Sequence, residues 1–189
     1  MTTTPTTQLY TFDAYLVLDA EQRCELVDGK LITMNPPTIE HFLIAKFIEQ
    51  ALDQEIKRCQ NPWLCFREAG VRTNLRRSRL TDVCVVTLDQ ARELGGSSAV
   101  FQTPPLLAVE VVSPDSVKRD YRQKRSEYGA LGIPEYWIID PLSDQGTVLE
   151  LKDGFYDETV LAGTDSLSSP LFPGLSLGLA DIFAAGDVG

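Results

Sequence analysis

The sequence predicts a mixed α/β fold in which helices cover a central sheet. Short apolar runs typical of buried strands recur along the chain, and segments with helical spacing of apolar residues separate some of them. The clearest example is the stretch 105–140, which predicts a buried strand, a basic helix and a second buried strand. With 189 residues, 43% of them hydrophobic, the chain is long enough for one domain and too short to expect two. We expect the Thr-rich residues 1–9 to form a flexible leader and residues 10–189 a single domain.

The composition argues against several classes of protein. The four cysteines form no C-x-x-C pair, and His41 is the only histidine, which speaks against a zinc site. The chain has no signal-peptide pattern, and no apolar run approaches the ~20 residues needed to cross a bilayer. We therefore expect a soluble, cytoplasmic protein with reduced thiols and no membrane contact. The net charge of −10 argues against a surface coated in positive potential for nucleic acid.

The first part of the chain predicts a hairpin and a long helix. Mixed apolar spacing over residues 10–20 predicts a short helix. Residues 25–34 predict an N-terminal hairpin, because two short apolar runs flank an Asp-Gly pair suited to a tight turn with positive φ. Thr38 provides an N-cap for a helix that continues to about Cys59.

The middle of the chain predicts strands separated by polar loops. Residues 63–73 predict a strand, and an arginine-rich loop follows it. Residues 82–87, with the sequence DVCVVT, predict a second short strand that begins with an acid. Residues 88–104 are polar and rich in glycine and serine, so we expect a loop with one helical turn.

The last part of the chain predicts the strand–helix–strand unit and a C-terminal hairpin. Residues 106–112 predict a buried strand, residues 116–131 a helix, and residues 136–139 another strand. Residues 147–161 predict the C-terminal hairpin around a second Asp-Gly pair. A short helix is expected near residues 179–183, within a tail rich in proline, glycine and serine.

Glu110 is a charged residue in an otherwise apolar strand. A buried carboxylate is costly unless a cation compensates it. Asp82 begins a neighbouring strand, so pairing of the two strands would bring both acids to one end of the sheet. Two close carboxylates favour a shared proton or a hard divalent cation, and oxygen ligands indicate Mg²⁺ or Mn²⁺. The alternative is that Asp82 caps a strand and Glu110 has a structural partner.

Lys124 lies on the apolar side of the predicted helix. At about 100° per residue, this lysine falls in the middle of a stripe of apolar and aromatic side chains. The stripe consists of Val117, Tyr121, Tyr128 and Leu131. Lys124 either reaches the two carboxylates, where it could position water or stabilise phosphoryl charge, or extends its ammonium to solvent along its apolar stem.

Nine of the 17 lysines and arginines lie in two short stretches. These are Arg72, Arg76, Arg77 and Arg79, and then Lys118, Arg119, Arg122, Lys124 and Arg125, and Asp120 is the only acidic residue within either stretch. They form either two solvated surfaces or a cationic rim around a site for an anionic substrate.

The order of these elements resembles the PD-(D/E)XK nuclease superfamily. The segments LVDGKLITM, EHFLIAKFI, DVCVV, LLAVEVVSPDS, YRQKRSEYGALGIPEYWIID and SPLFPGLSL are similar to the Uma family of restriction endonucleases, over roughly residues 10–185. The block 110–140 is the most specific part. The resemblance implies a restriction-endonuclease-like mixed central sheet flanked by helices.

By position, the resemblance implies roles for several residues. Asp82 matches the metal-binding aspartate, Glu110 matches the glutamate of the motif, and the carbonyl of Val111 would approach the metal. The following helix would supply the lysine as Lys124. A further acid on the first long helix would be Glu40, with His41 beside it, and the sequence does not decide between them.

The sequence departs from the superfamily pattern at two positions. Thr81 replaces the usual proline before the aspartate, which would change only the stiffness of the turn. Val112 stands where the superfamily has its lysine, so the assignment of a catalytic lysine depends on Lys124.

The expected function is Mg²⁺- or Mn²⁺-dependent hydrolysis of DNA phosphodiester bonds by an endonuclease. Asp82 and Glu110 would bind the metal, and Lys124 would activate water or stabilise charge. DNA phosphates would be contacted by Arg72, Arg76, Arg77, Arg79, Lys118, Arg119, Arg122 and Arg125. The resemblance also makes a homodimer an expectation. The alternatives are a catalytically silent nucleic-acid-binding protein, which the net charge favours, and an assembly protein in which Glu110 and Lys124 form a buried ion pair. DNA preference and biological role are not readable from the sequence.

Overall fold

A six-stranded mixed sheet forms the centre of the protein in the computed structural model, which describes residues 8–18 and 23–189. Its strand order is β11-β10-β9-β8-β6-β3, and only the β8–β9 neighbours are parallel. The strands are β3 (Trp63–Arg67), β6 (Val83–Thr87), β8 (Leu107–Val111), β9 (Glu135–Asp140), β10 (Gln145–Lys152) and β11 (Phe155–Ala162). The expected mixed α/β class is confirmed.

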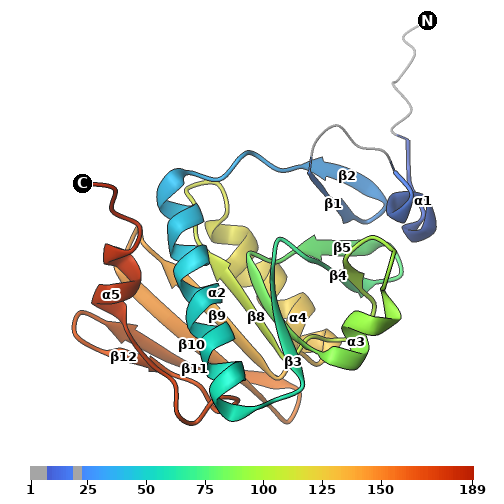
Figure 1. Ribbon diagram of the computed structural model, residues 1–189. Helices are drawn as coiled ribbons and strands as arrows, with labels where there is room; N and C mark the ends of the chain where they lie inside the picture. The colour runs from blue at the N-terminus through green and yellow to red at the C-terminus, as the bar shows by residue number, and fades with distance from the viewer. Residues whose placement is uncertain (1–7, 19–22) are drawn as a thin grey trace, which may run out of the picture.

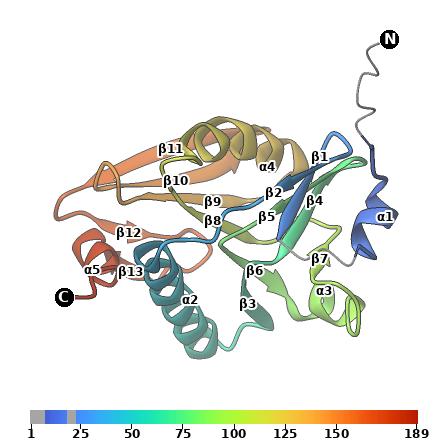
Figure 2. The ribbon, with the colours of Figure 1, turned by 90° about the horizontal axis from the view of Figure 1, so that it is seen from above.

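Helices cover both faces of this sheet (Figures 1 and 2). One face packs against α2 (Ile39–Cys59) and α5 (Leu179–Ala184), with Val109 and Val111 of β8 in the same apolar cluster. The opposite face packs against α4 (Arg125–Leu131), which the π-helical segment η1 (Arg119–Lys124) precedes. Ala108 and Val112 contribute to this second cluster. Because side chains alternate along a strand, Glu110 faces the α4 side.

The start of the long helix and the positions of the two hairpins agree with the predictions from the sequence. The Thr38 side chain accepts a hydrogen bond from the backbone of His41 and caps α2. The N-terminal hairpin consists of β1 (Cys24–Val27) and β2 (Lys30–Thr33), and β10 and β11 form the C-terminal hairpin. In the N-terminal turn, Asp28 has φ 52° and Gly29 has φ 80°, the conformation that favours an Asp-Gly pair.

A second sheet of five strands lies beside the first, and the sequence analysis did not separate the two. Its order is β2-β1-β5-β4-β7, with the helices α1 (Phe12–Leu16) and α3 (Leu88–Glu93) nearby in the chain. The added strands are β4 (Gly70–Asn74), β5 (Arg77–Leu80) and β7 (Val100–Phe101). The single strand predicted over residues 63–73 is therefore two strands in different sheets, and the predicted arginine-rich loop is largely the β4–β5 hairpin. Arg77 and Arg79 can lie in a strand because ion pairs compensate their charge.

The C-terminal tail closes the α2 side of the central sheet. A two-stranded sheet, β12 (Ser166–Ser168) and β13 (Ser176–Gly178), leads into α5 near the place where a short helix is expected. In the described residues, no helix is both long and apolar enough to cross a membrane. Residues 1–7 of the expected leader lie outside the described residues, and so does the end of the first predicted helix beyond residue 18.

Candidate active site

The site lies where the chain passes from the smaller sheet to the larger one. Asp82 follows β5 of the smaller sheet and immediately precedes β6 of the larger sheet. Val83 pairs with Val109 in the antiparallel β6–β8 ladder, so the residues beyond this pair, Asp82 and Glu110, lie at the same end of the two strands. The structure thus brings the two predicted acids to one cavity, which both side chains line.

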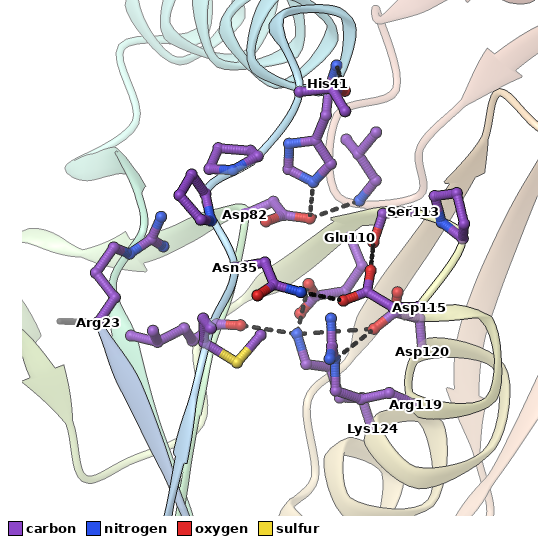
Figure 3. Close-up of a pocket in the computed structure, with 17 residues that line it drawn as sticks. Arg23, Asn35, His41, Asp82, Glu110, Ser113, Asp115, Arg119, Asp120 and Lys124 are labelled. Carbon is purple, nitrogen blue, oxygen red and sulfur yellow. Dashed lines mark hydrogen bonds and ion pairs between the residues drawn. The ribbon is translucent and has the colours of Figure 1, made fainter.

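Lys124 reaches this strand end from the other side of the cavity (Figure 3). Its Nζ atom donates hydrogen bonds to Oε2 of Glu110 at 2.7 Å and to the carbonyl oxygen of Leu80 at 2.8 Å. The hydroxyl of Tyr128 donates to the other carboxylate oxygen of Glu110 at 2.8 Å. Lys124 is only 2% exposed and Glu110 only 1%. The lysine therefore does not extend to solvent; it is a buried cation in contact with the predicted carboxylate.

The helix path explains why Lys124 points inward. The buried residues of this segment are Ser116, Asp120, Lys124 and Tyr128, each four positions after the last. In an α-helix, a four-residue step rotates a stripe by about 40° at each repeat, because the turn has 3.6 residues. The wider π-helical turn of η1 reduces this drift. The predicted stripe is consequently wrong at Val117, which is 41% exposed, and it omits Asp120, which is buried.

Asp82 is held by two donors on one of its oxygens. Its Oδ2 atom accepts a hydrogen bond from the backbone nitrogen of Val111 at 2.7 Å and lies 3.1 Å from Nε2 of His41. Burial raises the pKa of Asp82, but the hydrogen bond and charge of His41 and the charge of Lys124 outweigh this effect and lower the pKa overall. Burial lowers the pKa of His41, but the hydrogen bond and charge of the adjacent Asp82 together have the larger effect, so the pKa is raised overall. The pair is thus electrostatically coupled.

The structure distinguishes the two residues that the sequence leaves open at the start of α2. His41 lines the cavity and contacts Asp82, whereas Glu40 is exposed and packs beside Gly186. The Nδ1 atom of His41 is buried without a hydrogen-bond partner among the described residues. His41 is therefore the member of this pair that the geometry associates with the site.

The cavity contains more negative than positive side chains. Its volume is about 140 Å³. The charged residues that line it are Asp82, Glu110, Asp115 and Asp120, and Arg23, Arg119 and Lys124. Burial raises the pKa of Glu110 well above its usual value; Lys124 lowers it, while the charges of Asp82 and Asp120 raise it further. Burial also lowers the pKa of Lys124, but the charge of Glu110, followed by those of other carboxylates, raises it overall. Lys124 therefore stays protonated at neutral pH.

The donor atoms fit a divalent cation in type and charge. The carboxylates that line the cavity supply hard oxygen ligands, among them the buried Oδ1 atom of Asp120, which accepts no hydrogen bond from the described residues. As the side chains stand, however, no three metal-ligating side chains converge on one point within residues 8–18 and 23–189. Glu110 already accepts from Lys124 and Tyr128, so binding a cation requires rearrangement of these contacts.

A short segment of the chain forms part of the cavity wall. Residues 34–38, which connect β2 to α2, contribute to its lining. The side chain of Asn35 donates to Oδ2 of Asp115 at 3.0 Å and so joins this segment to the loop after β8 (Figure 3).

The basic residues expected to contact DNA fall into different environments. Arg79 is buried, and its guanidinium bonds Glu25 at 2.7 Å and Glu127 at 2.6 and 2.8 Å. The prediction that Arg79 contacts DNA is therefore wrong, because its guanidinium is buried and paired with two carboxylates. Arg77 pairs with Asp28 and Glu127.

The other predicted basic residues lie nearer the surface. Arg72 packs over the Phe12 ring, with 4.0 Å between the guanidinium carbon and the ring centroid, and Arg125 pairs with Glu158. Arg119 lines the cavity. The exposed members are Arg76, Lys118 and Arg122.

The fold is a mixed central sheet flanked by helices, as the resemblance implies. The Uma2 family, described as "Putative restriction endonuclease", matches residues 10–180, and the chain belongs to this family. The crystal structure of "a putative nuclease belonging to DUF820" from Anabaena variabilis superimposes with a TM-score of 0.78. That likeness covers 93% of this chain and 98% of the other, at 23% sequence identity. No curated protein matches the sequence.

Proposed function

We propose that this protein is a divalent-metal-dependent endonuclease that hydrolyses phosphodiester bonds in DNA. One observation supports the proposal most directly: two acids and a lysine, from separate elements, line a single buried cavity in a chain of this family. These residues are Asp82, Glu110 and Lys124. A cation surrounded by carboxylates beside a charged lysine is suited to stabilising the charge that develops on a phosphoryl group.

Asp82 and Glu110 would hold Mg²⁺ or Mn²⁺, with the carbonyl of Val111 as a further oxygen ligand. When bound, such an ion polarises the phosphodiester and lowers the pKa of a coordinated water. Lys124 would contribute its positive charge to the phosphoryl oxygens. Because its pKa is raised, Lys124 is a poor general base, and of the two roles expected from the sequence we favour charge stabilisation.

His41 would orient Asp82. A hydrogen bond to one carboxylate oxygen fixes the rotation of the group, and the backbone nitrogen of Val111 acts on the same oxygen. The second oxygen of Asp82 would then face the cavity. Such support of a ligand by neighbouring donors is common around metal sites.

Exposed basic residues would bind DNA phosphates near the cavity. Lys118 and Arg122 lie on the same helical segment as Lys124, and Arg119 already lines the cavity. The net charge of −10 makes this interaction weak and strongly dependent on salt. Assembly as a homodimer and a cytoplasmic location are further parts of the proposal.

The test is cleavage of supercoiled plasmid DNA with Mg²⁺ and with Mn²⁺ by wild-type protein and by Asp82→Ala. We expect nicked or linear product from the wild type and none from the variant or from wild type in EDTA. Asp89→Ala is the matched control, because Asp89 is exposed and pairs only with Arg92 on its own helix. Cleavage by Asp82→Ala at the wild-type rate would refute the site assignment.

A second candidate is a protein that has this fold but does not cut. It is favoured by the state of Glu110, whose two oxygens already accept from Lys124 and Tyr128. In that case calorimetry would detect no binding of Mg²⁺ or Mn²⁺. Retarded electrophoretic mobility of DNA without cleavage would then indicate a binding protein, and the absence of both would indicate an assembly role.

A further inference from the structure

We propose that Asp120 is a positioning residue of this site: it accepts the Lys124 ammonium when Glu110 turns to bind a divalent cation. The inference rests on the proposed function, because it assumes that a cation binds at Glu110. It adds a residue that the family motif does not include and a specific movement of the lysine.

Asp120 is a buried carboxylate, and one of its oxygens accepts no hydrogen bond in the described chain. The residue is 1% exposed and lines the cavity. Its Oδ2 atom accepts a short hydrogen bond from the hydroxyl of Ser116, whereas Oδ1 has no hydrogen-bond partner among the described residues. Burial raises the pKa of Asp120, which the charge of Lys124 opposes. Two cations lie near this oxygen without a hydrogen bond to it: Nε of Arg119 at 3.7 Å and Nζ of Lys124 at 3.8 Å. A buried carboxylate oxygen that accepts no hydrogen bond is costly, so a structural role alone does not account for it.

The surroundings of Asp120 fix the direction of its Oδ1 atom. The backbone nitrogen of Ser113 donates to the hydroxyl of Ser116 at 2.8 Å, and this hydroxyl donates in turn to Asp120. On the backbone side, the hydroxyl of Tyr136 donates to the carbonyl of Asp120 at 3.1 Å. Because the helix, its first turn and β9 all hold Asp120, its Oδ1 atom stays directed to the Lys124 side of the cavity, 3.8 Å from Nζ.

A cation at Glu110 would displace Lys124 from its present position. The ammonium nitrogen of Lys124 is 2.7 Å from Oε2 of Glu110, a typical distance for a charge-assisted hydrogen bond. A divalent ion on the same carboxylate would repel the ammonium strongly in a buried site. The lysine would keep its other contact, with the carbonyl of Leu80, and would need a new carboxylate partner.

Two carboxylates lie close enough to receive the displaced ammonium, and they differ in availability. Oε1 of Glu25 lies 3.7 Å from Nζ of Lys124, but Glu25 already binds Arg79 at 2.7 Å and the backbone nitrogen of Leu80 at 3.1 Å. Asp120 lies 3.8 Å away, and the oxygen that faces the lysine accepts no hydrogen bond in the described chain, with Nε of Arg119 3.7 Å from it. A shift of about 1 Å would complete a charge-assisted hydrogen bond to Asp120. Asp120 is therefore the acceptor that the geometry selects.

This role differs from direct metal ligation in one measurable respect. If Asp120 acts through Lys124, removing its charge should weaken cation binding only while the lysine is present. If Asp120 is itself a ligand, removing its charge should weaken binding whether or not the lysine is present. A double-mutant cycle separates the two cases, because it measures the coupling between the residues.

The experiment is titration of Mn²⁺ by calorimetry into wild type, Asp120→Asn, Lys124→Met and the double variant. We expect Asp120→Asn to weaken Mn²⁺ binding about tenfold in the wild-type background and less than about twofold in the Lys124→Met background. Equal weakening in both backgrounds would show that Asp120 is a ligand and overturn the proposal. No weakening in either background would overturn it as well.

Two further variants keep the test independent of folding defects. Ser116→Ala leaves the Asp120 carboxylate in place but removes its anchor, so it should weaken Mn²⁺ binding in the same lysine-dependent way and by a smaller factor. Asp140→Asn, a buried carboxylate on β9 that bonds Tyr121 outside the cavity, should leave the affinity unchanged. Circular dichroism without metal establishes that each variant is folded.

The outcomes also separate this inference from the proposed function. Wild-type protein that binds Mn²⁺ without coupling between Asp120 and Lys124 would contradict only the positioning role. Wild-type protein that binds neither Mn²⁺ nor Mg²⁺ would contradict the proposed metal-dependent function, and the positioning role with it.

Discussion

The ammonium nitrogen of Lys124 lies 2.7 Å from Oε2 of Glu110, although 14 positions separate the residues in the chain. Both side chains are almost fully buried, in a cluster that also contains Glu25 and Asp120. Removing water from a carboxylate and an ammonium is expensive, and their mutual attraction offsets this cost only when the geometry is close. Loss of one partner leaves the other as an uncompensated buried charge.

Lys124→Met should therefore destabilise the protein strongly. We expect a loss of about 3–5 kcal/mol in the free energy of unfolding, measured in urea at neutral pH without metal. Adding Glu110→Gln should recover part of the loss, because it removes the unpaired carboxylate. Lys46→Met on the exposed side of α2 is the control and should change stability by less than about 0.5 kcal/mol. If Lys124→Met lowered the free energy of unfolding no more than Lys46→Met does, the Lys124–Glu110 pair would contribute little to stability.

The ion-pair network around Glu127 predicts a dependence of stability on pH. Burial raises the pKa of Glu127, but hydrogen bonds and charge from Arg79, followed by Thr73 and Arg77, lower it overall from the usual 4.5. A carboxyl with a lowered folded-state pKa stabilises the protein above the unfolded pKa and loses this contribution as the pH falls through the folded value.

Glu127→Gln should accordingly cost about 2 kcal/mol of unfolding free energy at pH 7, and less as the pH falls below about 4.5. Urea unfolding of wild type and variant from pH 3 to 7 measures this difference. Asp89→Asn, at an exposed ion pair, should show almost no difference at any pH. A Glu127→Gln cost that grows on acidification would contradict the assigned direction of the pKa shift.

Two tyrosine hydroxyls, that of buried Tyr128 and that of partly buried Tyr156, should contribute unequally to stability because one has a charged acceptor. The hydroxyl of Tyr128 donates to the carboxylate of Glu110, and that of Tyr156 to the backbone carbonyl of Ile133, both at 2.8 Å. We expect Tyr128→Phe to cost about 1.5–3 kcal/mol and Tyr156→Phe about 0.5–1.5 kcal/mol in unfolding free energy. Chemical denaturation of both variants at pH 7 gives the comparison, and equal costs would indicate that Glu110 is neutral in the folded protein.

The exposed face of the helical segment should set the salt dependence of DNA binding. Each phosphate contact contributes about −0.9 to the slope of log K against log salt concentration. Arg122→Ala should therefore reduce the magnitude of this slope by about 1 for a duplex of any sequence, as measured by fluorescence anisotropy. Arg58→Ala, at the far end of α2 and paired with Glu55, should leave the slope unchanged. Identical slopes for wild type and Arg122→Ala would exclude a phosphate contact by Arg122.

The strongly patterned parts of the site were predictable from the sequence. Glu110 and Lys124 stand out because each is a charge on an apolar surface, and Asp82 because it begins an apolar strand. Asp120 could not be found in this way, because the assumption of 3.6 residues per turn fails across η1. The spacing of Ser116, Asp120, Lys124 and Tyr128 was the available signal. His41 could be preferred over Glu40 only once the start of α2 was placed against Asp82.

The division into two sheets could not be predicted from local pattern. β5 has the sequence RSRL, which reads as a polar loop, and it is a strand because Glu25 and Glu127 compensate Arg79 in the interior. Such compensation depends on residues about 50 positions away, which a local pattern does not include. The hairpin turns and the cap of α2 were predictable, because they depend on neighbouring residues alone.

The contact between Tyr136 and the carbonyl of Asp120 has a consequence for synthesis of the protein. A nascent chain that has emerged only through η1 contains Asp82, Glu110 and Lys124 but lacks β9, which pairs with β8 and supplies this tyrosine. Parallel pairing of this kind forms only after the intervening segment has folded back across the sheet. The cavity is thus completed late, and a chain truncated before residue 135 would contain the acids and the lysine without the support that holds them together.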